Sequence, residues 1–158
     1  PGSRLGYVAA EAETIQRLVD VKSATNSHTS MLPQILCAEF FKRGYYPAHH
    51  KRICDLYRTR RDAMLRSLDA YFPAGAKHSN PFTWVELPGG IDTTALLAES
   101  AADPAVNVAF LAGEGFFSDR NGQGKNCMRM SFGSTPEALI EEGVRRLGGL
   151  IRSKLEQA

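Results

Sequence analysis

Arg129 and Arg4 are the residues whose sequence contexts best suit ligand chemistry. Arg129 lies between two methionines on a predicted strand, and because strand side chains alternate, it is turned away from the face that the methionines occupy. A lone cation there needs an anionic partner, either a ligand or a core-edge carboxylate such as Glu114. Arg4 lies two residues from a glycine on each side. Taken by itself, Arg4 is most simply a surface arginine at a strand edge; the alternative is phosphate binding, since an arginine fork can bind a phosphate through charge-assisted hydrogen bonds.

Other groups that could do chemistry have a weaker pattern. His50 and Cys54 are four residues apart on a predicted helix, with His49 beside them, so they could face one metal ion. Structural zinc takes four ligands and no second cluster lies nearby, so we predict no metal site. Gly113 and Gly115 are not followed by the lysine-bearing helix of a phosphate loop and are interpreted as a bend.

Helices dominate the first half of the chain. The spacing of apolar residues and the turn-forming residues predict a strand at residues 5–9 and helices at 11–22, 30–43 and 48–71. Gly44 is placed to end the second of these helices, and residues 45–47 are predicted to form a turn.

The second half changes to short strands. Alternating, strand-forming residues predict strands at 82–87, 106–111 and 127–132, and Asp92 can cap a helix that runs to about residue 101. Ser134-Thr135-Pro136-Glu137 has the pattern of a capping box before a last helix. The fold class expected is α/β, with a small mixed or antiparallel sheet of about three strands covered by helices, plus an N-terminal strand and helix.

Composition sets broad limits on function. The chain has 158 residues, of which 43% are hydrophobic and 23% charged, and its net charge is +2. It has no basic tract, so nucleic-acid binding by this segment is not expected, and no apolar run approaches the roughly 20 residues that span a bilayer. The three cysteines are far apart, as in proteins of a reducing compartment, so we expect a cytoplasmic protein.

Five segments, in order along the chain, resemble the class I/II aminotransferases of the fold-type I family that depends on pyridoxal 5'-phosphate. The nearest group is similar to the 2-aminoadipate aminotransferase-like enzymes. The segments are Pro1-Gly2-Ser3-Arg4-Leu5-Gly6-Tyr7, the helical run at 56–65, Trp84-Val85-Glu86-Leu87-Pro88, residues 110–117 and Met128-Arg129-Met130-Ser131-Phe132. Together they cover nearly the whole chain, which makes the resemblance far more specific than any one motif.

The resemblance implies a cofactor, substrates and site residues. Arg4 matches the arginine that grips the cofactor phosphate, and Arg129 matches the one that binds the substrate α-carboxylate. The Schiff-base lysine of the family falls upstream of Pro1, so this segment alone is expected to be inactive. The resemblance further implies amino acid and 2-oxo acid substrates and a homodimer. None of the chain's own lysines is expected to replace the missing one, since all lie in helical or polar stretches: Lys22, Lys42, Lys51, Lys77, Lys125 and Lys154.

The resemblance also implies a division of the chain. Residues 1–30 correspond to a remnant of the large cofactor-binding domain, 31–72 to interdomain helices and 73–158 to the C-terminal small domain. Three parent proteins stay open: an amino-acid aminotransferase, a winged-helix transcription regulator of the GntR/MocR type with an aminotransferase-like effector domain, and a stand-alone α/β module without cofactor.

Overall fold

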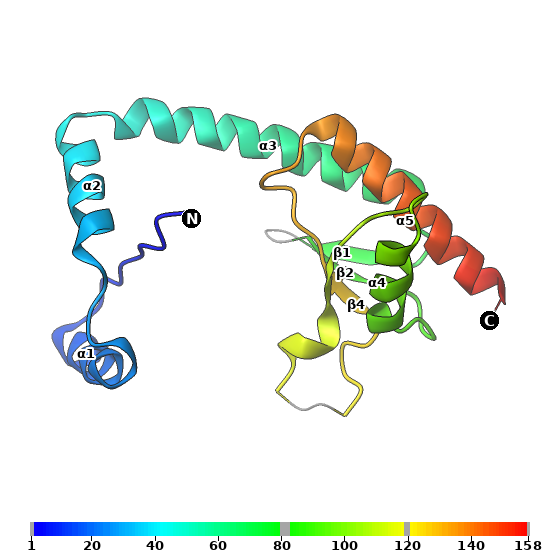
Figure 1. The fold of residues 1–158 in the computed structure, drawn as a ribbon, viewed down its shortest axis with the longest axis horizontal. Coiled ribbons are helices and arrows are strands. Elements are labelled where there is room, and N and C mark those ends of the chain that lie inside the picture. Colours follow the sequence, from blue (N-terminus) through cyan, green and yellow to red (C-terminus); the bar gives the residue numbers. More distant parts are fainter. Residues whose placement is uncertain (1, 80–82, 119–120, 158) are drawn as a thin grey trace. The chain divides into compact units, whose positions relative to one another are not determined.

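The computed structural model describes residues 2–79, 83–118 and 121–157. Contacts divide the chain into two compact units, Pro1–Arg52 and Ile53–Ala158. In chain order the elements are α1 (Ala12–Asn26), α2 (Met31–Lys42), α3 (Tyr46–Tyr71), β1 (Lys77–Ser79), β2 (Trp84–Glu86), α4 (Thr93–Ala102), β3 (Leu111–Ala112), the 3₁₀ helix η1 (Gly113–Phe116), β4 (Cys127–Arg129) and α5 (Glu137–Gln157). Figure 1 labels all of these except β3 and η1.

The first unit contains α1, α2 and the first residues of α3. Neither α1 nor α2 has a buried residue. The strand predicted at residues 5–9 is wrong, because the backbone there is irregular. The physical reason is that a strand needs a hydrogen-bonded neighbour, and the described part of this unit offers none. Large apolar side chains of α2 lie exposed instead: Met31, Leu32, Ile35, Leu36 and Phe41.

Gly44 ends α2 as predicted. Its φ is +72°, a left-handed conformation that glycine adopts without steric cost, and its N–H donates to the Phe41 carbonyl at 2.9 Å. The turn predicted at 45–47 is wrong beyond its first residue, because α3 already begins at Tyr46. Pro47 is tolerated there, since the first turn of a helix needs no backbone N–H donor.

The second unit is built on a four-stranded antiparallel sheet with the order β1-β2-β4-β3. The expected small antiparallel sheet is therefore present, with one more strand than predicted, because β1 was missed. The strand expected at 106–111 is reduced to β3. A turn replaces its first part, where the Asn107 N–H donates to the Asp103 carbonyl at 2.8 Å and φ of Asn107 is +45°.

Helices cover one face of this sheet and form the core with it. Val85 of β2 and Met128 of β4 are paired across the sheet and are both fully buried. Leu68 of α3, Leu96 of α4 and Leu147 of α5 belong to the same cluster. Asp92 caps α4 as predicted, since its carboxylate accepts hydrogen bonds from the N–H groups at positions 94 and 95, at 2.8 and 3.3 Å.

The end of α3 contacts α5 closely (Figure 1). The carbonyl of Tyr71 accepts a hydrogen bond from Arg152 of α5, an arrangement that satisfies one of the last carbonyls of a helix. A Cβ atom on Gly148 of α5 would lie 2.3 Å from the same Tyr71 oxygen. Only glycine fits at this contact. Within the described residues, no helix is both long and apolar enough to cross a membrane.

Gly148→Ala should destabilise the chain, because the new methyl group meets backbone at the contact between α3 and α5. We expect the free energy of unfolding, measured by urea denaturation, to fall by about 1–3 kcal/mol. The control is Gly149→Ala, where the new Cβ would meet no atom within 4 Å. Its free energy of unfolding should rise by roughly 0.5–1 kcal/mol, because alanine has the higher helix propensity. Equal effects of the two substitutions would contradict the packing described.

Candidate functional site

The register of the sheet places Arg129 on the face opposite the core. In an antiparallel ladder, residues directly opposite one another point to the same side. Arg129 is opposite Trp84 on one side and Leu111 on the other, and Trp84 is opposite Ser79. These four side chains form a row on the face that Val85 and Met128 do not occupy. The prediction that Arg129 points away from the face of its two methionine neighbours is confirmed, because Met128 and Met130 are both buried in the core.

An aromatic ring lies next to the Arg129 guanidinium, and two further rings are packed near it. Its central carbon lies 5.8 Å from the centre of the Phe116 ring, within cation–π range. Trp84 meets Phe116 edge to face, with ring centres 5.5 Å apart and an interplanar angle of 89°, and Phe117 lies 6.2 Å from Trp84. Arg129 itself is half-buried and its Nε atom is buried. We call Trp84, Phe116, Phe117 and Arg129 the arginine–aromatic cluster.

Two glycines hold η1, and with it Phe116, close to β4. A Cβ on Gly113 would lie 2.5 Å from the Cys127 Cβ and 2.6 Å from the Cys127 carbonyl oxygen. A Cβ on Gly124, where φ is +72°, would come within 2.2 Å of the Phe117 ring. The start of η1 therefore meets β4, and the Phe117 ring meets the backbone at Gly124, at distances that only glycine allows.

Cys127 shares the outer face of the sheet but is not a candidate nucleophile. Burial raises the pKa of its thiol, the charge of Glu86 raises it further, and a hydrogen bond with Trp84 lowers it by less. The thiolate is the reactive form of cysteine, so a raised pKa keeps this group protonated. Glu86 is opposite Lys77 in the ladder, with which it forms an ion pair at 3.6 Å.

A long-range contact ties α3 to the segment that follows β4. Arg60 donates from Nη1 to the Gly133 carbonyl at 2.5 Å, and its Nε lies 3.9 Å from the Glu137 carboxylate. The side chain of Arg60 is 17% exposed, so this contact is better shielded from water than a surface ion pair. It stabilises the connection between Arg129 and α5.

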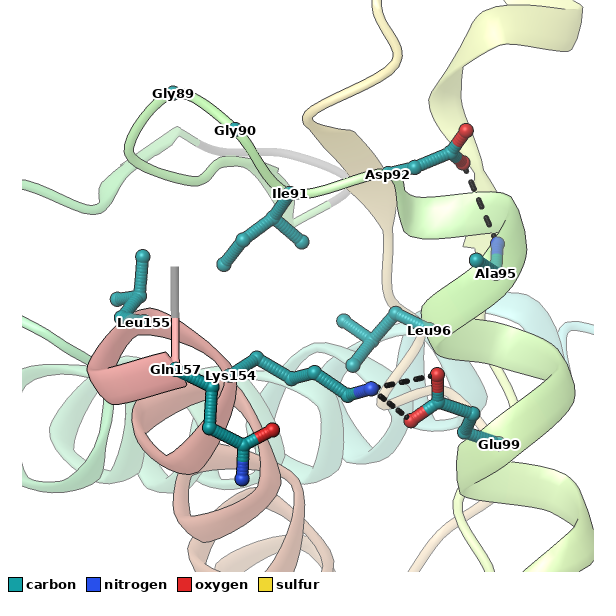
Figure 2. Close-up of a pocket in the computed structure, with 10 residues that line it drawn as sticks. All are labelled: Gly89, Gly90, Ile91, Asp92, Ala95, Leu96, Glu99, Lys154, Leu155 and Gln157. Carbon is teal, nitrogen blue, oxygen red and sulfur yellow. Dashed lines mark hydrogen bonds and ion pairs between the residues drawn. The ribbon is translucent and has the colours of Figure 1, made fainter.

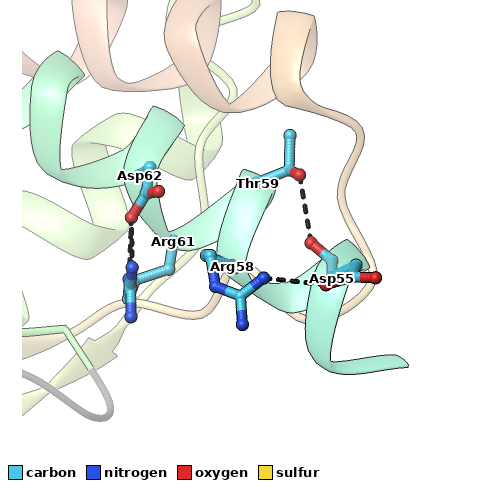
Figure 3. A network of polar contacts seen from close by, with 5 residues as sticks. All are labelled: Asp55, Arg58, Thr59, Arg61 and Asp62. Carbon is cyan, nitrogen blue, oxygen red and sulfur yellow. Dashed lines mark hydrogen bonds and ion pairs between the residues drawn. The ribbon is translucent and has the colours of Figure 1, made fainter. Parts of the chain in front are cut away.

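Further ion pairs of α3 join residues that are close together along the helix (Figure 3). Arg58 donates to the Asp55 carboxylate at 2.7 Å, and Thr59 to the Asp55 carbonyl at 3.0 Å. Arg61 makes hydrogen bonds of 2.6 and 2.8 Å to Asp62. The Arg58 pair is exposed and the Arg61 pair is only partly buried, and ion pairs so accessible to water contribute little to stability, typically below about 1 kcal/mol. They form a solvated helix face.

A cavity of about 350 Å³ lies away from Arg129, between the turn after β2 and the helices α4 and α5 (Figure 2). Its wall is mainly apolar, from Ile91, Leu96 and Leu155. Its opposite charges, Lys154 and Glu99, bind each other at 2.7 Å. The cavity therefore presents no uncompensated charge from this pair to a ligand.

Arg4 belongs to the first unit, whereas Arg129 belongs to the second. The Arg4 side chain is exposed, and its φ of +53° lies in the left-handed region that non-glycine residues rarely adopt. Backbone strain of this kind collects at ligand-binding positions. A Cβ on Gly2 or Gly6 would meet nothing within 4 Å, so the backbone around Arg4 is open.

The remaining candidates do not assemble into a site. All six lysines lie in described residues, and each is exposed or half-buried. His49 and His50 instead contact aromatic rings. The ring centres of His49 and Phe40 are 5.4 Å apart, and those of His50 and Tyr46 are 5.3 Å apart. In the described part of the chain, no group of three His, Cys, Asp or Glu side chains could hold a metal ion.

Sequence reasoning missed the aromatic members of the cluster. Trp84 and Phe116 are 32 positions apart in the numbering. The ladder register places Trp84 opposite Arg129, and η1 brings Phe116 to the same guanidinium. A usable signal was the pair Phe116-Phe117 directly after a bend with two glycines. Placed next to an expected strand that carries a lone arginine, adjacent aromatic residues are candidates for a cation–π contact.

Gly113→Ala should displace η1 from β4 and open the arginine–aromatic cluster. Trp84 is the only tryptophan, so its fluorescence in the 158-residue chain reports on this packing. We expect a red-shifted emission and a loss of stability of about 1–3 kcal/mol. The control is Gly115→Ala in the same 3₁₀ helix, where a Cβ meets nothing within 4 Å; its emission should match that of the unmodified chain. An unshifted Gly113→Ala spectrum would refute the close contact.

Comparisons with known proteins agree with this architecture. The aromatic-amino-acid aminotransferase 1 of Thermococcus litoralis is 36% identical over 161 residues, covering 99% of this chain and 37% of that protein. The crystal structure of LysN, an α-aminoadipate aminotransferase from Thermus thermophilus complexed with N-(5'-phosphopyridoxyl)-L-leucine, superposes with a TM-score of 0.83 and 35% identity. That match covers 100% of this chain and 40% of LysN.

A more distant match is YdfD, an uncharacterised helix-turn-helix transcriptional regulator of Bacillus subtilis, which is 26% identical over 157 residues. The match covers 96% of this chain and 31% of YdfD. The chain thus spans well under half the length of these relatives. The family model for aminotransferase class I and II matches residues 1–147. With that match, and with relatives above 30% identity over almost all its length, the chain belongs to the class I and II aminotransferase family.

Proposed function

We propose that this chain is the C-terminal part of an amino-acid aminotransferase, which transfers an amino group from an amino acid to a 2-oxo acid with pyridoxal 5'-phosphate. Family membership and the aminotransferase relatives support this proposal. In it, residues 1–30 belong to a large cofactor-binding domain, residues 31–72 are interdomain helices, and residues 73–158 form the small domain.

The observation that carries the proposal is the position of Arg129. It is a half-buried arginine on the outer face of the sheet, with the Phe116 ring against its guanidinium. A planar guanidinium binds a carboxylate through two parallel hydrogen bonds, and an arginine partly removed from water binds it more strongly than an exposed one. Arg129 is therefore assigned the α-carboxylate that all amino acids and 2-oxo acids share.

Arg4 is proposed to bind the phosphate of the cofactor. The exposed guanidinium, the left-handed backbone at Arg4 and the open space at Gly2 and Gly6 suit the approach of a bulky anion. Arg4 would contribute two of the fixed N–H donors that hold a phosphate. When bound, the cofactor supplies an electron sink at the α-carbon of the substrate.

The residue that attaches the cofactor is proposed to lie outside these 158 residues. Lysine forms the Schiff base with pyridoxal phosphate and must be available in its neutral form. Burial is one way in which a protein lowers a lysine pKa, and none of the six lysines of this chain is buried. We therefore assign binding and orientation to this segment, and expect no amino transfer by it alone.

A homodimer and a cytoplasmic location complete the proposal. The exposed apolar side chains of α2 (Met31, Leu32, Ile35 and Leu36) form a surface that other parts of the protein, or a second copy, would cover. In the described residues, Cys37, Cys54 and Cys127 form no disulfide, which suits a reducing compartment.

A regulator is the second candidate, because the alignment with YdfD covers 96% of this chain. The aminotransferase is favoured, since the aminotransferase relatives are more similar, at 35–36% identity against 26%. A regulator would bind the cofactor without turnover. The full-length protein separates the two when it is assayed with a panel of amino acids and 2-oxoglutarate.

Arg129→Met should weaken carboxylate binding in the full-length protein. We expect kcat/KM for amino transfer to fall roughly 30- to 1,000-fold, which corresponds to about 2–4 kcal/mol for a lost charged hydrogen-bond pair. Arg129→Lys should restore only part of the loss, because an ammonium lacks the planar fork. Arg58→Met removes an exposed arginine of α3 and is the control expected to keep wild-type rates.

Two results would contradict the proposal. Unchanged kcat/KM in Arg129→Met would show that Arg129 does not bind the substrate carboxylate, although the protein could still be an aminotransferase. Cofactor binding by the wild-type protein without transfer from any amino acid would favour the regulator.

A further inference from the structure

Phe116 is a large apolar side chain that the sheet does not bury. It is 50% exposed, although it belongs to the unit that contains the buried hydrophobic core. A phenylalanine ring left in water does not gain the free energy of burying apolar surface. A single exposed phenylalanine is nevertheless common on protein surfaces. Here the ring also lies against the Arg129 guanidinium, 5.8 Å from its central carbon.

The position of Phe116 is held from three sides. Trp84, which is opposite Arg129 in the ladder, meets the Phe116 ring at 89°. Gly113, at the start of η1, lies directly on Cys127, two residues before Arg129. Phe117 is packed on Gly124, where any side chain would collide with the ring. Because these contacts hold η1, they also hold the ring next to the guanidinium.

A ring in this position restricts the arginine in a useful way. The attraction between the cation and the electron-rich face of the ring favours one placement of a long side chain that otherwise has many rotamers. It also excludes water from one side of the guanidinium without using its hydrogen-bond donors, which lie in the guanidinium plane. The fork is thus pre-organised before an anion arrives.

We propose that Phe116 is a positioning residue for Arg129, which fixes the guanidinium for carboxylate binding through its ring face. The proposal rests on the proposed function of Arg129 as the carboxylate-binding residue. Phe116 acts through Arg129 and takes no part in the chemical step. Trp84 supports the arrangement by holding the Phe116 ring.

The test compares three substitutions in the full-length protein with its cofactor. Phe116→Leu removes the ring and keeps an apolar side chain, Phe116→Met fills the same space with a flexible one, and Phe116→Tyr keeps the ring face. We expect Phe116→Leu and Phe116→Met to raise KM for an amino acid roughly two- to thirty-fold with a smaller change in kcat. Phe116→Tyr should behave as the wild type.

A binding measurement separates positioning from general damage. Isothermal titration calorimetry with 3-phenylpropionate and with its carboxamide measures the part of affinity that depends on the carboxylate. Phe116→Leu should weaken binding of the acid and leave that of the amide unchanged. In an Arg129→Met background, Phe116→Leu should have no further effect on the acid, because the two residues act as one unit.

Equal losses for acid and amide, an undiminished effect of Phe116→Leu in the Arg129→Met background, or wild-type KM in both ring-deleting variants would each overturn the proposal. These outcomes differ from failure of the proposed function, in which the wild-type protein itself transfers no amino group. The calorimetric comparison does not need turnover, so it decides the role of Phe116 in that case as well.

Discussion

The pairing of Val85 with Met128 determines the arrangement of the second unit. Both side chains are fully buried against α3, α4 and α5. Because side chains alternate along a strand, burying this pair places the neighbouring pair, Trp84 and Arg129, on the other face. A slip of one residue would move the arginine into the apolar core, at a cost of several kcal/mol for an uncompensated charge. The hydrophobic core therefore fixes the position of the ligand-binding candidate.

The outer face depends on close backbone contacts as much as on side chains. Gly113 and Gly124 let η1 and the following loop approach β4 and Phe117 more closely than any other residue allows. On the other side of the sheet, Gly148 allows α5 to lie against the end of α3. The contact between Arg60 and the Gly133 carbonyl then fixes the segment that leaves β4. The contacts of Gly113 and Gly124 hold η1 in place, and with it Phe116 beside Arg129.

The sequence predicted the elements that have strong local signals. The apolar stripe of α5, the Asp92 cap and the outward turn of Arg129 follow from helical spacing, a helix-capping side chain and strand alternation, and all are present. β1 was missed because Lys77-His78-Ser79 has no apolar residue to mark a strand, and only pairing with β2 defines it. The strand at 5–9 was predicted from its apolar residues, yet no partner strand lies in the described part of its unit. The aromatic members of the cluster come together through the pairing of β2 with β4 and the placement of η1, which are contacts between distant segments that local sequence patterns do not contain. The roles of Arg4 and Arg129 stay proposals.

The central claim is that Arg129, held between the sheet and an aromatic ring, binds the carboxylate of the substrate. A crystal structure of the full-length protein with an amino acid or 2-oxo acid bound tests it most directly. The account predicts a carboxylate that accepts two hydrogen bonds from the Arg129 guanidinium, at about 2.7–2.9 Å, with Phe116 still against that side chain. A substrate carboxylate held by other residues, with Arg129 paired to a carboxylate of the protein, would contradict it.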